Sequence, residues 1–196
     1  SGAFDLALTG TTDDLSVGVA EADAVLAGAG RVQVGAIRDA DGLRLRDLDV
    51  RTEAARVQAS ATITSDQTEA EFSADLADLA LILPDLPGPA RLFGTATSAG
   101  AGPLIIDIGA TGPAASLAAE ATIETAPEGR TITADVSATL FDLTRYAAIA
   151  GRPLSGFVAA SANGVLLGDG QRFDGDVSLL TRDLRVGDAR IDPLLA

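Results

Sequence analysis

Polar and apolar residues alternate along much of the chain, which indicates strands with one apolar face. Between residues 131 and 140 the alternation has no exception, because every even position is apolar and every odd position is polar. Successive side chains of a strand point to opposite faces of its sheet, so this segment presents one face of each kind. The pattern recurs at 57–64, 69–76 and 117–124. We therefore expect several one-sided strands.

One segment breaks this alternation in a specific way. Leu43 and Leu45 are followed by Leu48 and Val50, so the parity of the apolar positions changes at Asp47. A β-bulge, in which one strand carries an extra residue, has this effect. We expect a bulge there.

Residues typical of turns separate the expected strands at short intervals. They occur at 41–42, 99–103, 112–113, 127–129 and 168–170. Such glycine- and proline-containing segments are typical of hairpin connections. About a dozen strands result, and twelve strands at a spacing of about 4.8 Å would make a sheet roughly 55 Å long.

Helical segments are few and short in this interpretation. The candidates are 21–27, 78–83, 143–150 and 191–196, each of one or two turns, and nearby prolines limit their extension. None of them is long enough to cover the sheet. The expected fold is therefore all-β: a long, repeat-built, mostly one-sided sheet curled into an elongated groove, with a few helices of one or two turns.

The apolar face of such a sheet needs a cover. A second sheet, closure into a barrel or solenoid, or an apolar ligand would each provide one. Alternation alone does not distinguish these covers, and an ordinary core packed against another sheet fits it as well as an open trough does.

The apolar positions define a candidate lining for a groove that binds acyl chains. Alanines would keep the groove wide, and larger side chains would line it. The candidate lining comprises Val57, Ala59, Ala61, Ile63, Ala70, Phe72, Ala74, Leu76, Leu104, Ile106, Ile108, Leu117, Ala119, Ala121, Ile123, Ile132, Ala134, Val136, Ala138 and Leu140. Each acyl methylene exposed to water costs about 0.8 kcal/mol, so a continuous apolar trough would need no further chemistry to hold a chain.

The chain also matches itself at two offsets. Residues 73–100 align without gaps on 137–164 with nine of 28 positions identical, and residues 4–27 align on 173–196 with 11 of 24 identical. Repeats of a sheet-building unit predict an array in which each unit contacts its neighbours. We expect residues 1–196 to form one continuous segment of a longer protein, with repeat units at approximately 73–136 and 137–196.

Composition excludes most catalytic and metal chemistry. The chain has no His and no Cys, which removes imidazole bases, thiolate nucleophiles and the commonest zinc ligands. The acidic residues Asp169, Asp174 and Asp176 do not have the spacing of a calcium loop. Glu69 with Glu71, and Glu120 with Glu124, fit an exposed strand face better than a glycosidase pair. We expect no enzyme activity, no cofactor and no metal.

The charge balance excludes another class of partner. Fourteen basic residues, all of them Arg, oppose 28 acidic residues, which gives a formal net charge of -14. Such a surface repels nucleic acid and anionic membranes at long range.

Two sequence features together resemble a known family. Residues 183–196 read Asp-Leu-x-Val-Gly-x-Ala-x-x-Asp-x-Leu-Leu-Ala, and residues 151–156 read Gly-Arg-Pro-Leu-Ser-Gly, between long strands rich in Ala, Gly and Thr. This pattern resembles the TamB proteins of Gram-negative bacteria, within the wider AsmA-like group. The resemblance extends over nearly all of the chain but carries no catalytic residues.

The resemblance implies a β-groove in the periplasm that moves phospholipids between the inner and outer membranes and supports outer-membrane protein assembly. It further implies phospholipid acyl chains as ligands, and an Omp85-type outer-membrane barrel and an inner-membrane anchor that both involve regions outside residues 1–196. The alternative is a structural or adhesive β-solenoid or sandwich of a secreted surface protein.

Overall fold

The structure is a computed structural model that describes residues 2–16, 18–126, 129–167 and 172–191. Its strands are β1 (Phe4–Asp13), β2 (Ala29–Arg38), β3 (Gly42–Arg51), β4 (Ala55–Thr64), β5 (Gln67–Leu76), β6 (Ala90–Ala99), β7 (Leu104–Gly112), β8 (Ala115–Ala126), β9 (Gly129–Leu140), β10 (Leu154–Leu167), β11 (Arg172–Val186) and β12 (Ala189–Ile191). The short helices are α1 (Ala20–Leu26), η1 (Leu79–Leu81), η2 (Leu143–Tyr146) and α2 (Ala147–Ala150).

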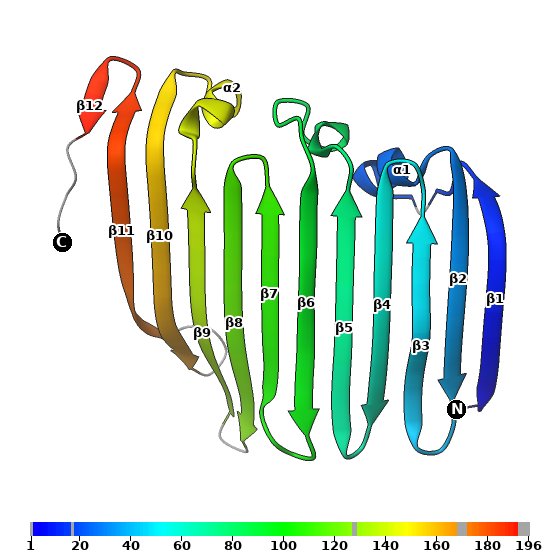
Figure 1. Cartoon of the computed structure of the whole chain (residues 1–196). Coiled ribbons are helices and arrows are strands. Elements are labelled where there is room, and N and C mark those ends of the chain that lie inside the picture. Colours follow the sequence, from blue (N-terminus) through cyan, green and yellow to red (C-terminus); the bar gives the residue numbers. More distant parts are fainter. Residues whose placement is uncertain (1, 17, 127–128, 168–171, 192–196) are drawn as a thin grey trace.

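All the strands belong to one sheet (Figure 1). The strand order from β1 to β12 follows the chain, and every neighbouring pair is antiparallel. Helical segments occur in the connections β1–β2, β5–β6 and β9–β10. The sheet is open and curled rather than closed into a barrel. The predicted all-β class and the predicted dozen strands are confirmed.

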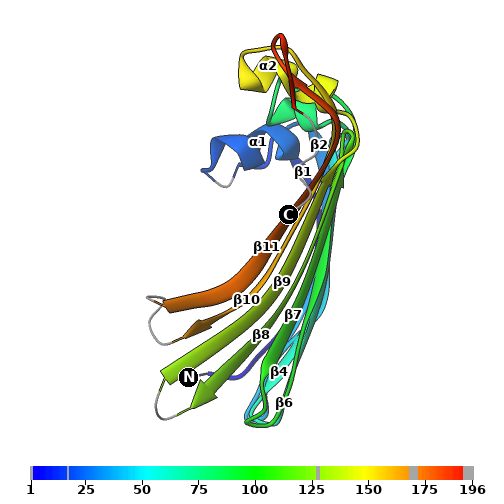
Figure 2. The ribbon, with the colours of Figure 1, turned by 90° about the vertical axis from the view of Figure 1, so that its left-hand side faces the viewer.

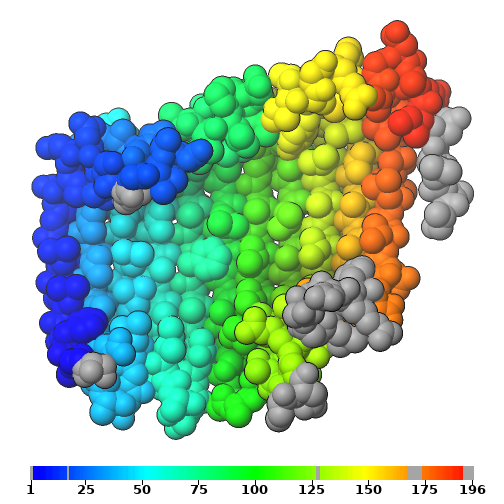
Figure 3. All heavy atoms as spheres, turned by 180° about the vertical axis from the view of Figure 1, so that it is seen from behind, coloured from blue at the N-terminus to red at the C-terminus, as the bar shows by residue number. Residues whose placement is uncertain are grey.

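Three of the four expected helical segments contain helix. They are α1, the single turn of η1, and η2 continued by α2. The fourth segment begins at Ile191, which ends β12, and its residues 192–196 lie outside the described residues. All the helical segments lie at the same end of the strands and on the same side of the sheet, the side toward which the sheet curves (Figure 2). Figure 3 shows that side, with the helical segments along its upper edge.

The expected bulge is present in β3. Gly35 of β2 faces Asp47, and the next residue, Ala36, faces Leu45, so Arg46 is the additional residue. The register with β4 shifts at the same place. The bulge keeps Leu43 and Leu45 on the same face as Leu48, which is why the apolar pattern changes parity without changing face.

The sheet has almost no conventional core. Leu86 and Leu143 are the buried hydrophobic residues of the described chain. The accessible surface is 12450 Å², whereas a compact folded protein of this mass would expose about 8,600 Å². Within the described residues, no second sheet covers either face.

Positions shared by the sequence repeats have similar conformations. Asp78 and Asp142, at the same place in the 64-residue repeat, each cap the 3-10 helix that follows. In the other repeat, Asp14 and Asp183 have φ of 52° and 50°, which non-glycine residues adopt rarely.

Candidate functional site

Strand register places all the residues of the candidate lining on one face, which we call the apolar face. One row across the sheet runs from Ala59 through Phe72, Gly94, Ile108 and Ala119 to Val136. The next rows contain Ala61, Ala70, Ile106, Ala121 and Ala134 on one side, and Val57, Ala74, Leu117 and Ala138 on the other. Leu76 and Leu140 lie nearest the helical end, and Ile63, Leu104, Ile123 and Ile132 nearest the opposite end. The alternating apolar positions of one strand therefore pair with the alternating apolar positions of its neighbours.

The apolar face is open rather than packed against protein. Val136 at its centre is 38% exposed, and Leu117 and Ile63 are 40% and 45% exposed. Values of this size are typical of half-covered side chains and not of a close-packed core, in which such residues are nearly inaccessible.

At the helical end this face becomes a recess of about 510 Å³, a size common among small-molecule sites. We call it the recess. Its floor contains Val57, Ala74, Leu76, Leu92, Ala110, Leu117, Ala138 and Leu140, and its roof contains Val25 of α1, Leu79 and Ile82 of the η1 segment, and Tyr146 of η2. The surface that lines the recess is almost entirely apolar, so the recess suits hydrocarbon and offers almost no hydrogen-bond partners.

Hydrogen bonds attach the roof of the recess to the strand ends. Thr52 Oγ1 donates to the carbonyl oxygen of Val25 at 2.8 Å, which holds the end of α1 against the β3–β4 connection. Tyr146 Oη donates to the carbonyl oxygen of Pro113 at 2.7 Å, which holds η2 against the β7–β8 turn. Burial raises the pKa of Tyr146 above its usual value.

The helix η1, between β5 and β6, and the helix η2, between β9 and β10, are each preceded by an aspartate at the equivalent position of the repeat. Asp78 Oδ1 accepts hydrogen bonds from the backbone N–H groups of Gly88 and Ala80, which lower its pKa. Asp142 Oδ1 accepts from the hydroxyl and the backbone N–H of Thr144, which lower its pKa in the same way. These caps satisfy N–H groups that a helix start otherwise leaves without partners.

Several residues of the recess were not among the predicted lining. Leu92 and Ala110 continue the row of Val57 and Ala74, but Phe93 is also large and apolar, and this obscures the alternation in β6. The register given by β5 would have identified both residues. The roof residues could not be predicted from the sequence, because the sequence of a short helical segment does not indicate which face of the sheet the segment covers.

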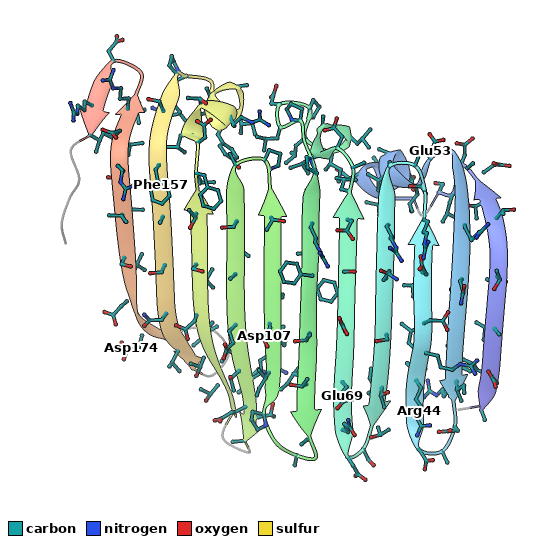
Figure 4. All side chains as sticks on the ribbon, in the orientation of Figure 1. Arg44, Glu53, Glu69, Asp107, Phe157 and Asp174 are labelled. Carbon is teal, nitrogen blue, oxygen red and sulfur yellow. The ribbon has the colours of Figure 1, made fainter. Side chains whose placement is uncertain are left out.

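The opposite face, which we call the polar face, carries the acidic side chains. Asp107, Glu120 and Asp135 face one another across β7, β8 and β9. A shallow hollow of about 920 Å³ lies beside them, over Gly109, Ala118 and Ser137. Figure 4 views this face, and Glu69 and Asp107 are labelled on it. This hollow is on the face that the sequence did not single out. It lies open on the sheet, and its lining combines apolar residues with the charged residues Glu71, Arg91 and Asp107.

Acidic side chains of the described residues do not assemble into a metal site. Glu69 and Glu71 lie on the polar face, as do Glu120 and Glu124. Asp174 and Asp176 lie on β11, and Asp169 lies outside the described residues.

None of the helices within the described residues has the length and apolar character needed to cross a membrane. Comparison with protein-family models, curated proteins and solved structures finds no match for this chain.

Proposed function

We propose that this protein binds the acyl chains of phospholipids on its apolar face and acts as a segment of a TamB-like β-groove. In this proposal the groove is periplasmic, belongs to a longer protein anchored in the inner membrane, and conducts phospholipid between the two membranes while supporting outer-membrane protein assembly. An Omp85-type barrel would contact regions outside residues 1–196. The protein would act as a conduit and not as an enzyme.

The observation that carries the proposal is an exposed, continuous apolar face that ends in a recess. Val136 lies half-exposed on the open part of this face, and Leu117 lies half-exposed in the floor of the recess. A dozen acyl methylenes transferred from water to such a surface would contribute roughly 10 kcal/mol before any cost of ordering is subtracted.

The surface area supports an apolar ligand over a closed structural protein. A sandwich or solenoid of a secreted surface protein would bury large hydrophobic side chains between its layers. Leu86 and Leu143 are the only large hydrophobic side chains that are buried in the described chain. The accessible area exceeds that of a compact protein by an amount on the order of 4,000 Å², which an acyl-chain ligand would reduce.

The test is mass spectrometry of an organic extract from protein purified without detergent. We compare the parent with the variant Ile123→Asp/Val136→Asp, which places two charges on the apolar face. The matched control is Thr122→Asp/Ser137→Asp, because these residues precede or follow the others in β8 and β9 and lie on the polar face. Circular dichroism verifies the β content of all three proteins.

The expected result is phospholipid in the parent and in the control, and its loss from the folded apolar-face variant. Absence of lipid from all three proteins would contradict the proposal, and so would equal lipid in all three. An unfolded apolar-face variant and a lipid-free parent together would favour an ordinary structural sheet.

A further inference from the structure

The charged residues of β1 to β10 lie on the polar face, with two exceptions. In β1 to β10 every Asp and Glu lies on the polar face by strand register. The charged residues of the apolar face in these strands are Arg38 and Arg130. Arg38 pairs with Phe4 and Leu43, and Arg130 lies two residues before Ile132 on the same face of β9.

Both arginines lie at the end of the strands that the helices leave uncovered. Arg38 is the last residue of β2, and Arg130 is the second residue of β9. We call this end of the apolar face the open rim. Roof helices cover the other end of the same face (Figures 2 and 3). The open rim and the recess therefore lie at opposite ends of the strands.

Neither guanidinium has a partner within the chain that the structure describes. Both side chains are exposed, and neither forms an ion pair or a side-chain hydrogen bond there. Next to Arg38, Oδ1 of Asp39 accepts hydrogen bonds from the N–H groups of Asp41 and Gly42 at 2.9 and 3.2 Å, and no ion pair joins Asp39 to Arg38 in the described chain. Each arginine is therefore available to an external anion.

We propose that the open rim is the headgroup side of the groove, where Arg38 and Arg130 bind the phosphate of a phospholipid whose acyl chains extend along the strands toward the recess. This inference rests on the proposed binding of acyl chains. It adds an orientation for the lipid and a chemical reason for it, since a guanidinium binds phosphate through two parallel hydrogen bonds.

The dimensions of the sheet agree with this orientation. Eight residues of strand separate Arg130 from Ala138 in the recess, which is about 26 Å at 3.3 Å per residue. A phospholipid measures about 20 to 22 Å from headgroup to terminal methyl, half of a bilayer of about 40 to 45 Å. A lipid with its phosphate at Arg130 therefore reaches the mouth of the recess.

Charge explains why two arginines would matter in an acidic protein. The net charge of -14 repels anions from most of the surface, so a phosphate near the groove has few favourable positions. Seven strand intervals separate β2 from β9, or about 34 Å at 4.8 Å each. Arg38 and Arg130 thus form two separate phosphate positions along the rim and not one composite site.

The first experiment compares two ligands that share their acyl chains and differ in the phosphate. We measure equilibrium binding of dioctanoyl phosphatidylcholine and of dioctanoylglycerol to the parent, to Arg38→Gln/Arg130→Gln and to the control Arg44→Gln. Arg44 lies two strand positions from the hairpin, on the polar face, and is exposed (Figure 4). We expect the double variant to weaken phosphatidylcholine binding about three- to tenfold, with diacylglycerol binding unchanged and the control equal to the parent.

The second experiment measures lipid orientation through the single tyrosine. The chain has one Tyr and no Trp, so Tyr146 in the roof of the recess is its intrinsic fluorophore. Phosphatidylcholine brominated near the terminal methyl should quench Tyr146 more strongly than phosphatidylcholine brominated near the carbonyl. The reverse order would overturn the orientation.

The outcomes separate the two proposals. Binding of both ligands by the parent with no selective effect of the double variant on phosphatidylcholine overturns the headgroup inference and leaves acyl-chain binding intact. Equal loss of both ligands from the double variant also overturns it, because the arginines would then act on the sheet and not on phosphate. Binding of neither ligand by the parent contradicts the proposed function itself.

Discussion

The ring of Phe72 lies over Gly94 on the neighbouring strand, at the centre of the apolar face. The two residues are cross-strand partners, and a Cβ at position 94 would lie 2.8 Å from Cε1 of the ring. Phe93 makes the same arrangement with Gly109 on the polar face. Each glycine thus leaves the space that an aromatic ring of the next strand occupies.

We expect Gly94→Ala to destabilise the sheet. The added methyl would meet the carbonyl oxygen of Asp107 at 2.5 Å as well as the Phe72 ring, so backbone and ring must both move, at a cost of about 1 to 3 kcal/mol. Urea unfolding followed by circular dichroism measures the change. Gly10→Ala in β1 is the control, because its Cβ would have no atom within 4 Å. A variant of Gly94 as stable as this control would contradict the close contact.

Filling the recess with a larger, uncharged side chain should reduce acyl-chain binding. Ala138→Phe introduces a ring into the recess floor, whereas Ser137→Phe introduces the same ring on the polar face of the same strand. We expect an affinity loss of about tenfold or more for the first variant, since an incoming chain loses the contacts that the ring replaces. Binding of dioctanoylglycerol measures it, and equal affinity of the two variants would argue against the recess as a binding site.

The carboxylate of Asp49 should make the free energy of unfolding depend on pH in acidic solution. Hydrogen bonding from Arg51, together with the charges of Arg51 and Arg56, lowers the pKa of Asp49 from its usual 3.8 to about 2, although partial burial opposes this. A lowered pKa in the folded state stabilises the protein above the unfolded pKa, and the contribution disappears as the pH falls through about 2. After solvent screening it is worth about 1 kcal/mol.

Urea titrations between pH 2 and pH 6 test this pH dependence. The free energy of unfolding of the parent should exceed that of Asp49→Asn above pH 4, and the difference should shrink as the solution is acidified. Glu69→Gln, at a polar-face residue without an ion pair in the described chain, is the control. A difference independent of pH would show that Asp49 acts through packing and not through its charge.

Asp142 should stabilise the roof of the recess. Its Oδ1 accepts from the hydroxyl of Thr144 at 2.6 Å and from the backbone N–H at 3.0 Å, and Asp142→Ala leaves that N–H without its cap. We expect a melting temperature lower by a few degrees and faster amide exchange across η2. Asp85→Ala, at an exposed residue of the connection between η1 and β6, serves for comparison. Unchanged exchange in η2 would refute the capping role.

Much of the sheet could be predicted because its information is local. Strict alternation reveals which side chains of a strand share a face, and the change of parity at Asp47 reveals the bulge, since both follow from the two-residue period of the backbone. The candidate lining shares one face for the same reason. Prediction was weakest in β6, where Leu92 and Phe93 are both large and apolar and only pairing with β5 decides which of them faces the recess.

The strands, their two faces and the position of the acidic residues opposite the apolar side follow from the order of residues along the chain, because parity is a property of neighbouring residues. Three features do not follow from it: no second layer of the described residues covers the apolar face, α1, η1 and η2 lie together at one end of that face, and Arg38 and Arg130 lie at the other. Curvature, the side to which a connection turns and the alignment of distant strands arise from contacts between residues far apart in the chain.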